Sequence, residues 1–290
     1  MTVYIYSLVE RIKKPWCLRA KEGAKAHGWD TEIINGNYNC SKVTEKDILI
    51  IWNRHIDQDA LALQFEKKGA KVFVLENPYL STKDEESWVS VGLGYHNNLK
   101  YAPKLLDSGE RFEKFGLDIK PWRKDGKHIL YTTQAKMYNQ KGLGWKDYAT
   151  PAGSDEDIIQ KIRKLTERKI VFRLHPKSKD YTPLRRSIGR SVSVSNAEAI
   201  GRCSIQSDLK NAWATVVWTS NSATDSLLAG IPVFIIGPGV YMKSVCHMGL
   251  NFIENPKLPD GRLDLFNRMA WAQYSVNEVR SGFMFDCLLS

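Results

Sequence analysis

The sequence lacks any apolar run that approaches the roughly 20 residues of a membrane-spanning helix. Residues 1–8 are strand-like, without the basic region and long apolar stretch of a signal peptide. The five cysteines are odd in number and widely spaced, and they form no Cys-x-x-Cys pair, so the sequence predicts neither a disulfide framework nor a zinc site. We therefore expect a soluble, cytoplasmic protein with reduced thiols and no bound metal or resident cofactor.

Positive charge is in excess, with a formal net charge of +10. Residues 161–190 hold eleven Lys or Arg against two acidic residues, and residues 100–127 hold eight against five. A concentrated basic surface attracts polyanions such as nucleic acid, or the phosphates of a nucleotide. Alternatively, Lys161, Lys164 and Arg168 recur at helical spacing because they form the solvated face of an amphipathic helix.

Two series of alternating strands and helices indicate two α/β lobes, each with a parallel, doubly wound sheet. The first series has strands at residues 3–8, 31–34, 47–52 and 71–76, and helices at residues 16–27 and 58–68. The second has strands at residues 128–133, 169–174, 191–195 and 233–236, and helices at residues 155–167 and 204–211. Between them, residues 77–126 show no clean period of 2 or 3.6, and such a long irregular segment is usually functional.

Residues 215–239 predict a strand, a tight polar turn, a short helix and a second buried strand. The turn consists of Thr219, Ser220, Asn221 and Ser222. Backbone N–H groups at such a turn converge at the positive end of the helix, which suits a phosphate. An ordinary structural unit with a Ser/Thr/Asn helix cap explains the same residues, and this alternative stays open.

Arg173, His175 and Lys177 follow one another at the carboxyl end of a predicted strand, the edge where ligands bind in open α/β sheets. The imidazole of His175 can donate a hydrogen bond to a phosphate oxygen or protonate a leaving group. Arg173 and Lys177 add positive charge beside it. A purely structural histidine at a strand end is the alternative.

These features in this order resemble the glycosyltransferases of the two-lobed GT-B type. The order is a strand ending in His175-Pro176, then the polar turn at residues 219–222, then Gly-Ile-Pro-Val and a Gly-Pro turn. The sequence is most similar to the capsule-polysaccharide and glycerophosphate-polymer transferases and to phage-encoded DNA glycosyltransferases. The tail at residues 271–282, WAQYSVNEVRSG, resembles the closing segment of the phage group. The likeness covers residues 173–282, and the first half matches in architecture alone.

The resemblance implies two Rossmann-like lobes with a cleft between them. Residues 1–122 would form an acceptor-side lobe, residues 123–265 a donor-binding lobe, and residues 266–290 helices that pack back on the first lobe. Ser275 is the expected N-cap of one such helix, with Glu278 at the capping-box position. The donor is expected to be a UDP-linked sugar. The resemblance places His175, Thr219, Ser220, Asn221 and Ser222 at the donor site, and we expect Arg173, Lys177 and Gly237 to bind the donor with them.

We expect a metal-independent transferase, because basic residues and a helix N-terminus can stabilise a leaving phosphate without a divalent ion. The triplet Asp155-Glu156-Asp157 has the spacing of a metal-binding D-x-D pair but lies at a predicted helix start. An inverting enzyme also needs a base for the acceptor hydroxyl. Glu76, at a strand end, is our first choice; the weaker candidates are Asp84, Glu85 and His96.

Three hypotheses for function follow. The leading one is sugar transfer to a hydroxymethylated pyrimidine in phage DNA, in the host cytoplasm, with Arg185, Arg186 and Arg190 contacting the nucleic acid. The second is transfer to a cell-surface or capsule glycan, since such acceptors are often anionic. The third is a nucleic-acid-binding or nucleotide-binding protein without catalysis, because fold alone never settles function. The oligomeric state and the identity of the sugar stay open.

Overall fold

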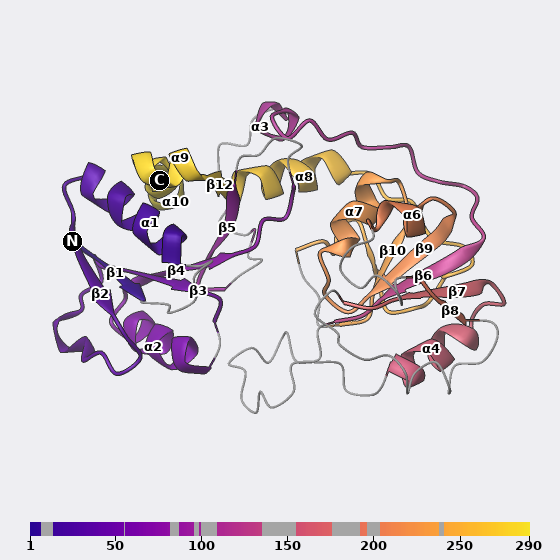
Figure 1. Ribbon diagram of the computed structural model, residues 1–290, viewed down its shortest axis with the longest axis horizontal. Helices are drawn as coiled ribbons and strands as arrows, with labels where there is room; N and C mark the ends of the chain where they lie inside the picture. The colour runs from indigo at the N-terminus through magenta and orange to yellow at the C-terminus, as the bar shows by residue number, and fades with distance from the viewer. Residues whose placement is uncertain are drawn as a thin grey trace. The chain divides into compact units, whose positions relative to one another are not determined.

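A computed structural model describes residues 1–6, 14–54, 56–81, 87–95, 99, 109–134, 155–175, 192–195, 204–237 and 241–290 (Figure 1). The chain forms two compact units. The first contains Met1–Leu117 and Asp264–Ser290, and the second contains the described residues between Asp118 and Leu263. Across the described ranges, no helix is both long and apolar enough to cross a membrane.

The first unit is built on a six-stranded sheet in the order β12-β5-β4-β3-β1-β2. Neighbours among β1 to β4 pair in parallel, whereas β5 is antiparallel to both of its neighbours. The central strand β3 reads ILIIW and is buried along its whole length, as expected for a strand covered on both faces. The strands are β1 (Thr2–Tyr6), β2 (Asp30–Ile34), β3 (Ile48–Trp52), β4 (Lys71–Glu76), β5 (Trp88–Leu93) and β12 (Gln273–Ser275).

Helices cover both faces of this sheet (Figure 1). Because successive strand residues point to opposite faces, Val3 and Ile5 pack in one core with α1, α9 and α10 residues, while Tyr4 packs in another with α2 residues. The helices are α1 (Lys14–Ala26), α2 (Ile56–Lys67), α3 (Glu110–Glu113), α8 (Arg262–Trp271), which begins at the unit boundary, α9 (Val276–Ser281) and α10 (Phe283–Leu289), with a short 3-10 turn η1 (Cys40–Lys42).

The second unit has a fully parallel six-stranded sheet in the order β11-β10-β9-β6-β7-β8. One core lies between this sheet and α4, and a second core gathers Leu130, Leu209 and Ile231. The strands are β6 (His128–Thr132), β7 (Lys169–Arg173), β8 (Val192–Val194), β9 (Ala212–Val217), β10 (Val233–Ile235) and β11 (His247–Met248), and the helices are α4 (Asp155–Arg163), α6 (Gln206–Leu209) and α7 (Ser222–Leu228).

The expected α/β class with two Rossmann-like units is confirmed, as is the return of the C-terminal helices to the first unit. Arg280 of α9 pairs with Glu22 of α1 at 2.8 Å, and a Cβ on Gly23 would lie 2.1 Å from the carbonyl oxygen of Val279. The predicted capping box also forms, because the Ser275 hydroxyl accepts the Glu278 N–H and the Glu278 carboxylate accepts the Ser275 N–H.

Three expectations about local structure are wrong. Residues 77–126 include strand β5, in which Ser90 and Gly92 interrupt the alternation of apolar residues. The tail, expected to be helical, contains strand β12, which is too short to show a period. The helix expected at residues 155–167 ends at Arg163. There the Arg163 guanidinium donates to the carbonyls of Thr166 and Arg168, which turns the chain toward β7. Arg168 therefore does not lie on a helix face.

Candidate functional site

The candidate site lies at the carboxyl edge of the second sheet, where the order of strands reverses. From β6 the chain adds β7 and β8 on one side, and then returns to add β9, β10 and β11 on the other. The reversal therefore falls between β6 and β9. Ligands of open α/β sheets bind outside the carboxyl ends of the strands at such a switch point.

Hydroxyl groups from the ends of β6 and β9 meet at this point. The Oγ1 of Thr132 lies 2.7 Å from the Oγ of Ser222, which donates in turn to the Oγ of Ser220 at 3.0 Å. Beside them, the Gln134 amide donates to Thr219 Oγ1 at 2.9 Å. Of the residues predicted to bind the donor, Ser220 and Ser222 thus form a hydrogen-bonded cluster with Thr132, and Thr219 is bonded separately to Gln134.

His175 is tied to the same edge through its backbone. Its N–H donates to the Oγ1 of Thr133 at 2.9 Å, and the N–H of Thr133 donates to the carbonyl of Arg173 at 3.0 Å. Since Thr133 follows Thr132 directly, His175 at the end of β7 lies beside the cluster of hydroxyls that Thr132, Ser220 and Ser222 form at the end of β6. This is the juxtaposition that the sequence motif predicts.

The residues that make this connection were missed in the sequence. Thr132 ends β6 and continues into Thr133 and Gln134, and each of the three contacts a predicted donor-site residue. Three polar residues in succession at the end of a buried strand are the signal that identifies them, because parallel strands present their carboxyl ends at one edge.

Arg173 has an internal partner. Its guanidinium is largely buried and pairs with the Asp208 carboxylate at 2.7 Å, and the same oxygen accepts a hydrogen bond from Ser195 at 3.0 Å. Burial raises the pKa of the nearby Asp225 carboxyl to about 6, and the Arg173 charge offsets part of that rise. A direct role for Arg173 at a donor phosphate stays a prediction.

Gly237 and Asn221 occupy the two turns beside this group. A Cβ on Gly237 would lie 2.6 Å from the Trp218 carbonyl and 2.9 Å from its ring, so only glycine fits there without a shift of the chain. The Gly237 N–H donates to that carbonyl at 3.2 Å, which fixes the β10 end beside the residue that precedes Thr219. Asn221 is exposed and accepts a hydrogen bond from Tyr241 at 3.4 Å.

Glu76 belongs to the first unit and ends β4, at the carboxyl edge of its parallel strands. Its side chain is half-buried, and its carboxylate accepts the Asn77 N–H at 2.8 Å. The proposed base is therefore held by its own turn.

Several predicted site residues lie outside the described residues. They are Lys177, Arg185, Arg186 and Arg190, together with the weaker base candidates Asp84, Glu85 and His96. The described part of the basic segment, residues 161–175, contains the exposed Lys161, Lys164 and Lys169 and also Arg163, Arg168 and Arg173. All three guanidinium groups have partners within the second unit, so these arginines are less available to a polyanion than the exposed lysines beside them.

The acidic triplet with the spacing of a metal-binding pair lies at a helix start. Asp155, Glu156 and Asp157 form the first turn of α4, as expected, and Asp155 accepts a hydrogen bond from the buried Tyr131 hydroxyl at 2.8 Å. In the parts of the chain that the structure describes, no three His, Cys, Asp or Glu side chains are grouped closely enough to hold a metal ion.

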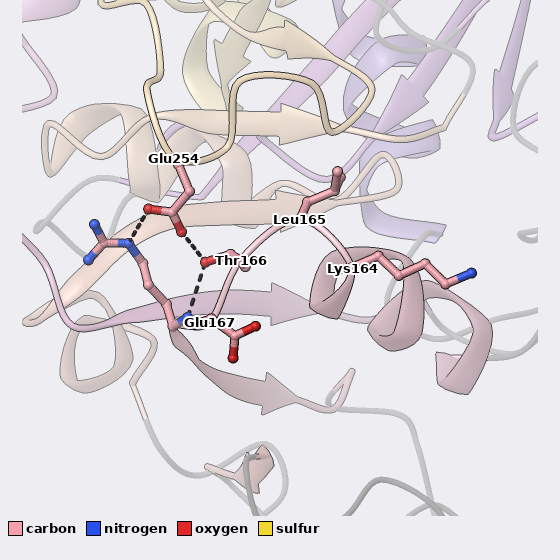
Figure 2. A pocket seen from close by; sticks show the side chains of 6 residues that line it. Lys164, Leu165, Thr166, Glu167 and Glu254 are labelled. Atoms are coloured by element: carbon pink, nitrogen blue, oxygen red, sulfur yellow. Dashed lines mark hydrogen bonds and ion pairs between the residues drawn. The ribbon is translucent and has the colours of Figure 1, made fainter.

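A pocket occurs at the opposite edge of the second sheet, before the start of β7. It is lined by Lys164, Leu165, Thr166, Glu167, Arg168 and Glu254 (Figure 2). Glu254 accepts hydrogen bonds from the Thr166 hydroxyl and from Arg168, and the Arg168 guanidinium lies 4.1 Å from the centre of the Trp213 ring. These contacts stabilise the turn between α4 and β7. The pocket is separate from the strand ends that carry the candidate site.

No protein-family model and no curated protein matches the sequence. Two solved transferases of KpsC from Thermosulfurimonas dismutans are similar to the chain in structure. The β-Kdo 2,7 transferase has 16% identity and a TM-score of 0.53, covering 98% of this chain and 99% of that one. The β-Kdo 2,4 transferase has 15% identity and a TM-score of 0.56, covering 97% and 98%.

At these identities the likeness shows the fold alone. The chain therefore has the two-unit GT-B fold that the sequence motifs predict. Of the two groups that the sequence resembles, the capsule-polysaccharide transferases are supported at the level of fold. The resemblance to the phage DNA enzymes stays a prediction.

Proposed function

We propose that the chain is a glycosyltransferase that binds a nucleotide-sugar donor at the carboxyl edge of the second sheet. This proposal rests on the cluster of three hydroxyls from Thr132, Ser220 and Ser222, which lies where the order of the strands reverses. His175 lies at the end of the neighbouring strand. Hydroxyl and imidazole groups donate hydrogen bonds to phosphate oxygens. Their convergence at a switch point supports a phosphate-bearing ligand.

In the proposed reaction, Glu76 is the base and His175 contacts the leaving phosphate. The Glu76 carboxylate takes the proton of the acceptor hydroxyl, and the acceptor oxygen forms a bond to the anomeric carbon of the sugar. The bond between that carbon and the donor phosphate oxygen breaks, and the phosphate leaves with the electron pair. His175 and the hydroxyls of Ser220 and Ser222 stabilise the charge that develops on this phosphate.

For the acceptor we propose an anionic cell-surface or capsule glycan. Support comes from the fold, which is shared with two β-Kdo transferases. Hydroxymethylated DNA is the second candidate, because the basic segment at residues 161–190 carries nine more positive than negative charges. The internal partners of Arg163, Arg168 and Arg173 weigh against it, and Lys161, Lys164 and Lys169 are the exposed basic residues that the described part of the segment retains.

A transfer assay tests both the proposed sugar transfer and the proposed acceptor. The protein is mixed with a panel of radiolabelled UDP-linked and CMP-linked sugars and either capsule oligosaccharides or hydroxymethylpyrimidine DNA. Label in the oligosaccharide supports the first acceptor, and label in DNA supports the second. Absence of transfer from every donor, together with salt-sensitive DNA binding, would instead favour a binding protein without catalysis.

A further inference from the structure

Gln273 holds a loop that lies far from it in sequence. It begins β12, its side chain is completely buried, and its amide makes three hydrogen bonds to backbone groups of the loop after β4. The Oε1 atom accepts the N–H groups of Tyr79 at 3.0 Å and Leu80 at 2.9 Å, and Nε2 donates to the Leu80 carbonyl at 3.0 Å. One buried side chain thus holds three backbone groups of this loop.

Ser90 holds the other side of the same loop. It lies on β5, is 1% exposed, and pairs in register with both Glu76 on β4 and Gln273 on β12. Its hydroxyl lies 2.8 Å from the Asn77 carbonyl oxygen, to which it donates, and 3.3 Å from that of Glu76. Glu76, Ser90 and Gln273 therefore form one row across three neighbouring strands.

The two sets of contacts hold the stretch from Glu76 to Leu80. Tyr79 and Leu80 are buried, whereas Asn77 is exposed and Glu76 is half-buried. Buried polar contacts are costly to break, because water cannot replace the lost partner. The start of the loop, residues 76–80, is consequently held at both ends by side chains that solvent does not reach.

We propose that Gln273 and Ser90 are positioning residues, which set the place of the Glu76 carboxylate and its loop for the acceptor hydroxyl. This inference rests on the proposed function, because it takes Glu76 as the base. A base must lie within hydrogen-bonding reach of the proton that it removes, and a misplacement of about 1 Å can lower the rate by about a hundredfold. The positioning role also explains why the closing segment at residues 271–282 contains a glutamine, because the Gln273 side chain contacts the loop that follows Glu76.

The test uses Ser90→Ala and Gln273→Glu in the full chain. Ser90→Ala removes one hydroxyl, and Gln273→Glu keeps the shape and the two acceptor contacts but loses the donation to Leu80. Arg280→Ala is the matched control, because it lies in the same segment and removes an exposed pair with Glu22. Transfer kinetics are measured with the donor and acceptor that the wild type uses, and amide hydrogen exchange is measured at residues 79 and 80.

We expect both variants to lower kcat at least tenfold while the KM for the donor stays within twofold, and the control to change neither. Exchange at residues 79 and 80 should accelerate in Gln273→Glu. Unchanged kcat in both variants, with transfer by the wild type intact, would overturn the positioning role alone, whether or not exchange accelerates. Absence of transfer by the wild type would overturn the proposed function and this role with it.

Discussion

The side-chain oxygens of Thr132 and Ser222 lie 2.7 Å apart, although 90 residues separate them in the chain. This contact joins the two strands between which the order of the second sheet reverses. It places a pair of hydroxyls, with Ser220 beside them, where a ligand of an open α/β sheet binds.

Removal of one of these hydroxyls should weaken donor binding. We expect Ser222→Ala to raise the Kd for the donor about five- to tenfold, roughly 1–1.4 kcal/mol, because the hydroxyl loses its contacts with the phosphate, Thr132 and Ser220. Titration calorimetry measures the affinity. The matched control is Ser207→Ala, which changes an exposed serine in the same unit and should leave the Kd unaltered. Equal affinities in the two variants would remove Ser222 from the site.

His175→Ala should lower donor affinity or turnover at least tenfold, about 1.4 kcal/mol, because the imidazole stabilises the leaving phosphate. Donor Kd and kcat are measured together to separate binding from catalysis. His247→Ala serves as the histidine control, since that ring stacks on Phe234 and its Nε2 contacts the Lys257 carbonyl. Kinetics for His175→Ala that match those of the wild type would favour the structural alternative for this residue.

Asp225 should make stability depend on pH. Burial raises the pKa of its carboxyl from 3.8 in the unfolded chain to about 6 in the fold. The favourable contribution is present below about pH 4 and is lost as the pH rises through 6, because the fold then contains a buried charge. Asp225→Asn should therefore be more stable than the wild type at pH 8, by about 1–3 kcal/mol, and should lose this advantage near pH 4.

Urea denaturation at pH 4, 6 and 8 measures this difference. Asp264→Asn is the control, since Asp264 is exposed and pairs with Arg268 within one helix. A stability gain for Asp225→Asn that is equal at all three pH values would show that the Asp225 carboxyl does not titrate in this range.

Arg111 should be essential for the stability of the first unit. It is 3% exposed, binds both oxygens of Glu278 at 2.8 and 2.9 Å, and donates to the carbonyls of Ala270 and Gln273. Arg111→Lys cannot reproduce this planar set of contacts and should cost about 3–5 kcal/mol in urea denaturation. Arg19→Lys, at a half-exposed pair with Glu22, should cost less than about 1 kcal/mol. Similar costs for the two substitutions would contradict this role.

The sequence predicts the elements that have a strong apolar pattern or clear turn and capping residues. The continuous apolar run of β3, the turn from residue 219 to residue 222 and the capping box of Ser275 and Glu278 all lie where local patterns place them. These features depend on neighbouring residues, so one stretch of sequence contains the information.

The partners that complete the site depend on contacts that no local pattern contains. Asp208 meets Arg173 across 35 residues, and Gln273 reaches Tyr79 across 194. Strand β12 exists because it pairs with β5, since its three residues have no period of their own. Sequence reasoning therefore finds the motif residues and misses the buried polar side chains that hold them.

The most direct measurement is a crystal structure of the protein soaked with a UDP-linked or CMP-linked sugar. We expect the phosphate oxygens to lie within hydrogen-bonding distance of the Ser220 and Ser222 hydroxyls and of the His175 imidazole, at the carboxyl ends of β6, β7 and β9. A nucleotide bound elsewhere, for example in the pocket beside Glu254, would contradict the assignment of the donor site.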